Sequence, residues 1–65
     1  MKALKAWVAR DDNGMLYLYL AKPRKSKWVW MSNIRFDFIE LSRELFPEVK
    51  WEDEEPTEVT ITINK

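Results

Sequence analysis

Hydrophobic and polar residues alternate most regularly in two stretches near the N-terminus, residues 3–10 and 15–21. The four residues between them, Asp-Asp-Asn-Gly at 11–14, are typical of a tight turn. Alternation on both sides of such a turn predicts a β-hairpin with strands Ala3–Arg10 and Met15–Ala21.

The register of this hairpin follows from its turn. If residues 12–14 form a three-residue loop with Gly14 in the left-handed region, Asp11 faces Met15. The further pairs are then Arg10 with Leu16, Val8 with Leu18 and Ala6 with Leu20. One face of the hairpin becomes aliphatic: Leu4, Ala6, Val8, Leu16, Leu18 and Leu20. The other face carries Lys5, Trp7, Ala9, Tyr17 and Tyr19, and a one-residue slip of one strand would destroy this sorting.

Three later segments have clear patterns. Residues 22–27 predict a basic loop, because Pro23 cannot donate a hydrogen bond to a central ladder. Residues 27–31 predict a third strand with Trp28 and Trp30 on one face. Residues 57–64 alternate well and predict a half-buried strand whose apolar side is Val59, Ile61 and Ile63.

The stretch between residues 33 and 46 fits two interpretations. Apolar residues recur at helical spacing behind a possible Asn33 cap, which predicts a helix over 33–46. Aromatic and β-branched residues at 36, 38 and 39 favour instead a strand over 36–41. In that case Ser42 caps one helical turn over 43–46, and Pro47 ends it.

These elements predict the fold class. A chain of 65 residues is too short to build two hydrophobic cores, so residues 1–65 form a single domain. We expect a mainly β protein, a small antiparallel sheet of four to five strands with one short helical turn near 42–46. The alternative is an α+β fold with a helix at 33–46. The expected core is Leu4, Ala6, Val8, Leu16, Leu18, Leu20, Val59, Ile61 and Ile63.

Composition excludes several function classes. With 46% hydrophobic residues the chain is too apolar to be disordered. It contains no Cys, which excludes disulfides, thiolate metal sites and a cysteine nucleophile. It also contains no His, the commonest general base and metal ligand. We therefore predict a protein that is not an enzyme, with no catalytic residues, no metal and no cofactor.

The sequence also bears on location. No apolar run approaches the roughly 20 residues that a membrane-spanning helix needs, and the N-terminus lacks the apolar block of a secretory signal peptide. The absence of cysteine fits a reducing compartment. We expect a cytoplasmic protein with no membrane partner.

Charge is balanced overall but divided between the two halves of the chain. Residues 1–35 carry eight cations and two carboxylates, a net charge of +6, and residues 36–65 carry three cations and nine carboxylates, a net charge of −6. Such a division marks either a basic face for an anionic partner or an acidic half that folds back over a basic half. In a domain this small we favour the internal match.

One group of residues has the composition of a binding surface. Aromatic rings beside cations can hold single-stranded nucleic acid, because bases stack on the rings while the cations contact phosphates. Tryptophan and tyrosine are equally enriched at protein–protein hot spots, and in a small sheet they also serve as core. The candidate binding residues are Trp7, Tyr17, Tyr19, Trp28, Trp30, Lys22, Arg24, Lys25 and Lys27.

Several segments together carry a family resemblance. They are KAWVARD at 5–11 with Gly14 and the LYL of 16–18, LFPEVKWED at 45–53, and EVTI at 58–61. With these segments the chain resembles a group of short uncharacterised proteins of gut bacteria, often associated with phages and other mobile elements. The resemblance spans most of the chain and matches least between Pro23 and Arg35. It implies roles such as binding a host factor, and it transfers no activity, cofactor or catalytic residue.

The sequence therefore predicts a small non-catalytic interaction or accessory protein. Its partner is another protein, or a second copy of the chain in a homo-oligomer. The alternative is single-stranded nucleic-acid binding through the aromatic sheet face and the basic loop.

Overall fold

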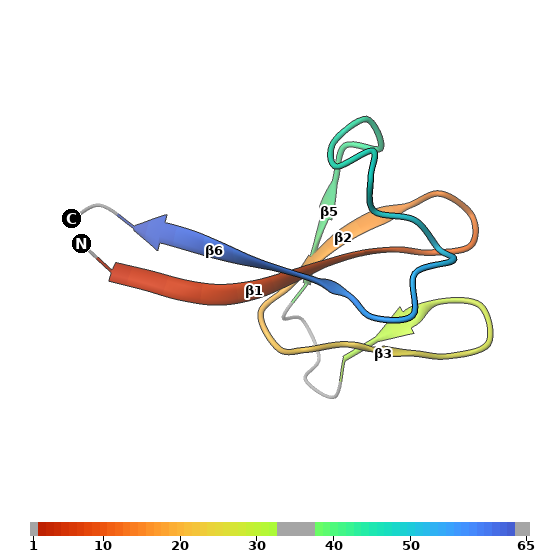
Figure 1. Ribbon diagram of the computed structural model, residues 1–65, viewed down its shortest axis with the longest axis horizontal. Coiled ribbons are helices and arrows are strands. Elements are labelled where there is room, and N and C mark those ends of the chain that lie inside the picture. The colour runs from red at the N-terminus through yellow and green to blue at the C-terminus, as the bar shows by residue number, and fades with distance from the viewer. Residues whose placement is uncertain (1, 33–37, 64–65) are drawn as a thin grey trace.

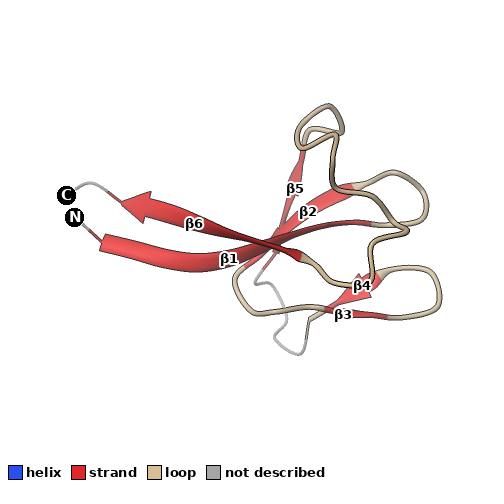
Figure 2. Ribbon diagram, viewed as in Figure 1, coloured by secondary structure: helices blue, strands red, loops and turns tan. Residues whose placement is uncertain are grey.

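The computed structural model describes residues 2–32 and 38–63 and consists of strands and loops (Figures 1 and 2). Its elements are β1 (Lys2–Arg10), β2 (Leu16–Tyr19), β3 (Arg24–Lys25), β4 (Trp30–Met31), β5 (Phe38–Leu41) and β6 (Thr57–Ile63). A four-stranded antiparallel sheet has the order β5-β2-β1-β6, and β3 and β4 form a separate two-stranded sheet. The mainly β, antiparallel fold predicted from the sequence is confirmed.

The β1–β2 hairpin has the predicted register. Val8 lies opposite Leu18 and Arg10 opposite Leu16. At the turn, the Asp11 N–H donates to the Met15 carbonyl over 2.8 Å, and Gly14 has a φ of 91°. This φ is in the left-handed region, which glycine adopts without the steric cost that a Cβ adds. The predicted sorting of aliphatic and aromatic side chains onto opposite faces therefore holds.

Strand β6 lies beside β1 and extends the sheet into a two-stranded ribbon. The β1–β6 pairing runs from Lys2 opposite Ile63 to Val8 opposite Thr57, whereas β2 pairs only with residues 7–10 of β1. Residues 2–6 and 59–63 therefore project beyond the rest of the sheet, and the chain termini lie at their free end (Figure 1). We call this segment the ribbon.

The aliphatic core is concentrated at the opposite end of the sheet. Val8 and Leu16 are fully buried, and Val49, from the loop before β6, packs on them. Partly buried side chains surround this cluster: Leu18, Leu41, Phe46 and Val59. Val49 was not among the predicted core residues, because nothing in the local pattern of 47–56 indicates that this loop folds back over the sheet.

The prediction that Leu4 and Leu20 belong to the core is wrong. Leu4 is 38% exposed and Leu20 is 53% exposed. Leu20 follows the end of β2 and takes no part in the ladder with Ala6. Leu4 lies in the ribbon, which only two strands form. Ala6 is buried and Ile61 half-buried as predicted, while the side chain of Ile63 is outside the described residues.

The ambiguous stretch contains a strand. Phe38–Leu41 forms β5 and pairs with β2, which excludes the alternative helix over 38–46; residues 33–37 lie outside the described part. The turn expected near 42–46 is present but is not helical: it is one hydrogen-bonded turn, in which the Leu45 N–H donates to the Ser42 carbonyl over 3.1 Å. The chain then reverses at Phe46, whose φ of 50° prevents helical continuation.

The basic loop and the third strand need correction. Arg24–Lys25, expected in the loop, forms β3, and the strand expected over 27–31 is only Trp30–Met31. A turn over 26–29 joins the two strands, closed by the Ser26 N–H and the Val29 carbonyl over 2.8 Å. Trp28 therefore lies in a turn, 63% exposed, while Trp30 is 5% exposed, so the two rings do not share a strand face.

Candidate functional site

The aromatic face of the sheet is assembled as predicted and includes one additional ring. Trp7 lies opposite Tyr19 in the β1–β2 ladder, and Phe38 lies opposite Tyr19 on the other side. The Phe38 ring centroid is 5.6 Å from that of Tyr17, edge to face, and 5.9 Å from that of Tyr19. Phe38 is 49% exposed. It was missed as a site residue because its face depends on the pairing of β5 with β2.

Tyr17 is half-buried on this face, opposite Glu40. Burial, the charge of Glu40 and the charge of Asp11 together raise the pKa of Tyr17 above its ordinary value of 10.0. Its hydroxyl is therefore a neutral hydrogen-bonding group at physiological pH, and it has no activation as an acid or a nucleophile.

Part of the aromatic face is buried in the core and is not accessible to a ligand. Tyr19 is 3% exposed and Trp30 5% exposed, and both pack with Ala9 in a second buried cluster. The Tyr19 hydroxyl donates to the Trp30 carbonyl over 3.2 Å. Tyr17 and Trp51 pack against this cluster. Tyr19 and Trp30, both predicted as binding residues, therefore act as core here, and a ligand cannot stack on them without opening the fold.

Asp11 fastens the β3–β4 sheet to this face. Asp11 is 6% exposed, and its carboxylate accepts a hydrogen bond from the backbone N–H of Trp30 over 2.9 Å. The Trp30 indole Nε1 donates in turn to the Arg10 carbonyl over 3.1 Å. Burial raises the pKa of Asp11 above its ordinary value, and the hydrogen bond from Trp30 partly offsets this. The sequence identified Asp11 only as a turn residue, because its partner is nineteen positions away.

Arg10 holds the loop that covers the aliphatic core. Its guanidinium donates hydrogen bonds to five backbone carbonyls: Val49 at 2.7 Å, Gly14 at 2.9 Å, Leu45 at 3.1 Å, and Arg43 and Phe46 at 3.2 Å. A guanidinium has five N–H donors in a fixed planar fork, so this arrangement uses its full donor capacity. Arg10 is therefore a structural cation and is not available to a ligand.

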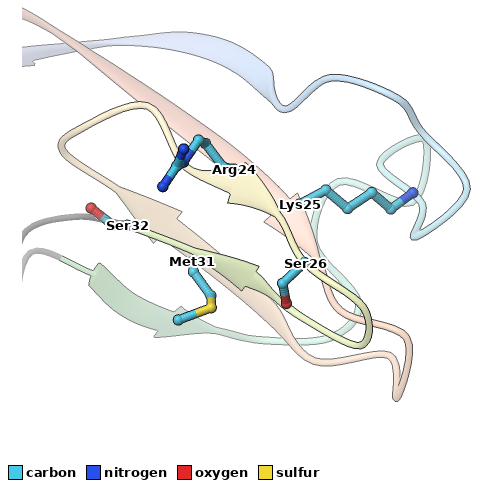
Figure 3. Close-up of a pocket in the computed structure, with 5 residues that line it drawn as sticks. All are labelled: Arg24, Lys25, Ser26, Met31 and Ser32. Atoms are coloured by element: carbon cyan, nitrogen blue, oxygen red, sulfur yellow. The ribbon is translucent and has the colours of Figure 1, made fainter.

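Two of the four predicted basic binding residues are also engaged within the fold. The Lys25 ammonium donates to the carbonyls of Trp51 and Asp53 and lies 4.3 Å from the Trp51 ring centroid. Figure 3 shows its side chain extending away from Arg24 and Met31. Lys22 forms an ion pair with Glu55 at 3.2 Å. Together with Lys5–Glu58 at 3.8 Å, this pair joins the basic half of the chain to the acidic half, as the internal-match interpretation predicts.

The remaining predicted residues lie on the β3–β4 hairpin. Lys27 lies 5.6 Å from the ring centroid of the exposed Trp28. Arg24 lines an open cavity of about 230 Å³ with Lys25, Met31 and two serines (Figure 3). The Ser26 hydroxyl in this cavity donates to the Val29 carbonyl over 2.7 Å. The cavity therefore offers the exposed guanidinium of Arg24, and its lining residues include no carboxylate.

Several other apolar side chains on the aliphatic face are only partly buried or are exposed. Cross-strand pairs place Leu18 beside Ile39, Ala6 beside Val59, and Leu4 beside Ile61. We call the group Leu4, Leu18, Ile39, Val59 and Ile61 the open aliphatic surface. Ile39 is 57% exposed and Leu4 38% exposed, and the other three are half-buried. Leu18 and Ile39 lie on β2 and β5, Leu4, Val59 and Ile61 lie on the ribbon, and the fully buried Ala6 and Val8 lie between the two groups.

No protein-family profile, no curated protein and no solved structure matches the chain. Within residues 2–32 and 38–63, no group of three or more acidic side chains is placed to hold a metal ion. In the same part of the chain, no helix is long and apolar enough to cross a membrane.

Proposed function

We propose that the protein is a small non-catalytic interaction protein that binds a protein partner, or a second copy of itself, through the open aliphatic surface. The observation that carries this proposal is the exposure of Leu4 and Ile39 on the same face of the sheet as the buried Val8 and Leu16. Monomeric proteins seldom leave a contiguous apolar surface on water without a partner for it. Burial of such a surface is the main favourable term in protein association.

The chemistry of the chain supports a non-catalytic role. The chain has neither His nor Cys. Asp11 is the only buried charged side chain in the described residues, and its carboxylate is occupied by the Trp30 N–H. A cytoplasmic setting is part of the proposal, because a cysteine-free chain needs no oxidising compartment.

A capture experiment with matched variants tests the proposal. Ile39→Lys places a charge on the open aliphatic surface, whereas Leu45→Lys makes the same change at a residue of similar exposure, 48%, on the loop after β5. We expect the wild type and Leu45→Lys to retain the same partner, and Ile39→Lys to lose it. Equal retention by both variants contradicts it, as does an enzymatic turnover that copurifies with the protein and disappears on a single carboxylate or serine substitution.

Single-stranded nucleic-acid binding is the second candidate, and one observation favours it. Trp28 is 63% exposed at the tip of a hairpin that also carries Lys27 and Arg24. Stacking of a base on such a ring contributes about 1 to 3 kcal/mol, and the cations would make binding salt-dependent. If the protein binds single-stranded nucleic acid in this way, its affinity for an oligonucleotide should fall steeply with salt and should be lower in Trp28→Ala. Absence of binding at low salt rejects it.

A further inference from the structure

The outer edge of β6 is an unpaired strand edge. β6 borders the four-stranded sheet, and within residues 2–32 and 38–63 its only neighbour is β1. Over the ribbon, β1 also has no second neighbour in this part of the chain, because β2 pairs only with residues 7–10. A two-stranded ribbon is marginally stable in water, and a third strand is the usual requirement for independent stability. The ribbon would therefore gain stability from one more strand.

Natural sheets protect exposed edges with lysine, proline, bulges or short strands. The other exposed edges of this sheet have such protection: Lys2 and Lys5 lie in the free part of β1, and β5 has only four residues. β6 is seven residues long, contains no lysine, arginine or proline, and its only charge is Glu58. It is therefore the edge best suited to accept a strand.

We propose that the strand it accepts is β6 of a second copy, paired antiparallel about a two-fold axis at Thr60. This inference rests on the proposed function, of which it specifies the self-associating form. Centring the axis on Thr60 pairs all seven residues of the strand. The pairs are Thr60 with Thr60, Val59 with Ile61, Glu58 with Thr62, and Thr57 with Ile63 of the second copy.

This register matches the two faces of the sheet. On the aliphatic face, Val59 meets Ile61 of the second copy, which continues the row formed by Ala6 and Val59 in one chain and by Leu4 and Ile61 in the other. The aliphatic faces of the two ribbons thus become one. On the opposite face two threonines meet at the axis, a favourable cross-strand pair, and Glu58 meets Thr62 and not a second carboxylate.

The overall charge also favours a second copy as the partner. The formal net charge is zero, so two copies approach without mutual repulsion, and a net charge near zero promotes association. Thr60 and Thr62 are already exposed in the single chain.

Three variants and a mass measurement test the register. Sedimentation of the wild type from micromolar to millimolar concentration is expected to show a shift from one chain to two. Thr60→Lys and Thr60→Glu each place like charges opposite each other at the axis, and both should weaken dimerisation by at least about tenfold. Thr62→Lys is the matched control, because it faces Glu58 of the second copy and should leave the dimer as strong or stronger.

Cross-linking provides a direct readout, because the wild-type chain has no cysteine. In the Thr60→Cys variant, the thiols at position 60 of the two copies should form a disulfide across the axis. Thr62→Cys should not, because its two copies lie about 13 Å apart along the strands. A wild type that stays one chain at every concentration overturns this inference but leaves binding of a different protein open. A dimer that Ile39→Lys breaks and Thr60→Lys does not also overturns it, while supporting the open aliphatic surface.

Discussion

The two ends of β1 have the same alternating sequence but different surroundings. At Trp7 and Val8 the strand has neighbours on both sides, and the Trp7–Arg10 end is covered by Val49 on one face and Trp30 on the other. In the ribbon the strand pairs with β6 alone among the described residues, and Leu4 reaches solvent. Alternation thus determines which way a side chain points. Burial depends on whether another segment returns to cover it.

Two polar side chains explain why the covered end is covered. Arg10 binds the loop over the aliphatic face, and Asp11 binds the β3–β4 sheet over the aromatic face. They are adjacent in the chain and hold segments far away in the sequence. The ribbon has no equivalent anchor in the described residues. Its ion pair, Lys5–Glu58, has a separation of 3.8 Å, and both side chains are exposed to solvent. The following four predictions test this contrast, beginning with the largest effect.

Truncation of a leucine should have very different costs at the two ends. Leu16→Ala removes a fully buried side chain and should lower the free energy of unfolding by about 2 to 4 kcal/mol. Leu4→Ala removes a side chain that is 38% exposed and should cost about 1 kcal/mol or less. Denaturant unfolding of both variants measures the difference. Equal costs would contradict the division of the sheet into a covered end and an open ribbon.

Loss of the Arg10 fork should be the next largest effect. Arg10→Ala leaves five carbonyls without their donor and should destabilise the fold by about 2 to 3 kcal/mol. Arg10→Lys should recover less than half of this loss, because an ammonium has three donors and cannot reproduce the planar fork. Full recovery with lysine in thermal unfolding would show that charge alone matters there.

Two substitutions of Asp11 should change the free energy of unfolding in opposite directions. Asp11→Ala leaves the buried Trp30 N–H unsatisfied and should cost about 1 to 3 kcal/mol. Asp11→Asn retains the acceptor oxygen and removes the buried charge, so it should stabilise the protein at neutral pH.

The pH dependence follows from the direction of the shift. Because burial raises the pKa of Asp11 in the folded state, the unfolded chain loses this proton first. Its contribution to stability is fully present below the ordinary pKa and is lost as pH rises through the folded-state pKa. The advantage of Asp11→Asn over the wild type should therefore grow between pH 3 and pH 7 in unfolding titrations. An advantage that is constant with pH would contradict a buried, shifted carboxyl.

The smallest effect is expected in the ribbon. Glu58→Gln removes the exposed ion pair with Lys5 and should change the free energy of unfolding by less than about 0.5 kcal/mol. A cost comparable to that of Arg10→Ala would mean that the ribbon has an anchor of its own.

Much of the main sheet could be predicted from the sequence because its determinants are local. The turn at 11–14 sets the register of Val8 against Leu18, and the alternation of 57–63 identifies β6. The roles of Arg10, Asp11 and Val49 could not be predicted, since each depends on a partner distant in the chain. For the same reason the sequence assigned Tyr19 and Trp30 to a binding face that the fold uses as core.

Amide hydrogen exchange of β6 at low and high protein concentration distinguishes an open ribbon edge from a paired one. We expect weak protection of Thr57–Ile63 in dilute solution and stronger protection at high concentration, as the ribbon edge pairs. Amides of Leu16–Tyr19, between two neighbouring strands, should be well protected at both concentrations. Protection of β6 equal to that of β2 and independent of concentration would contradict an open ribbon that a second copy completes.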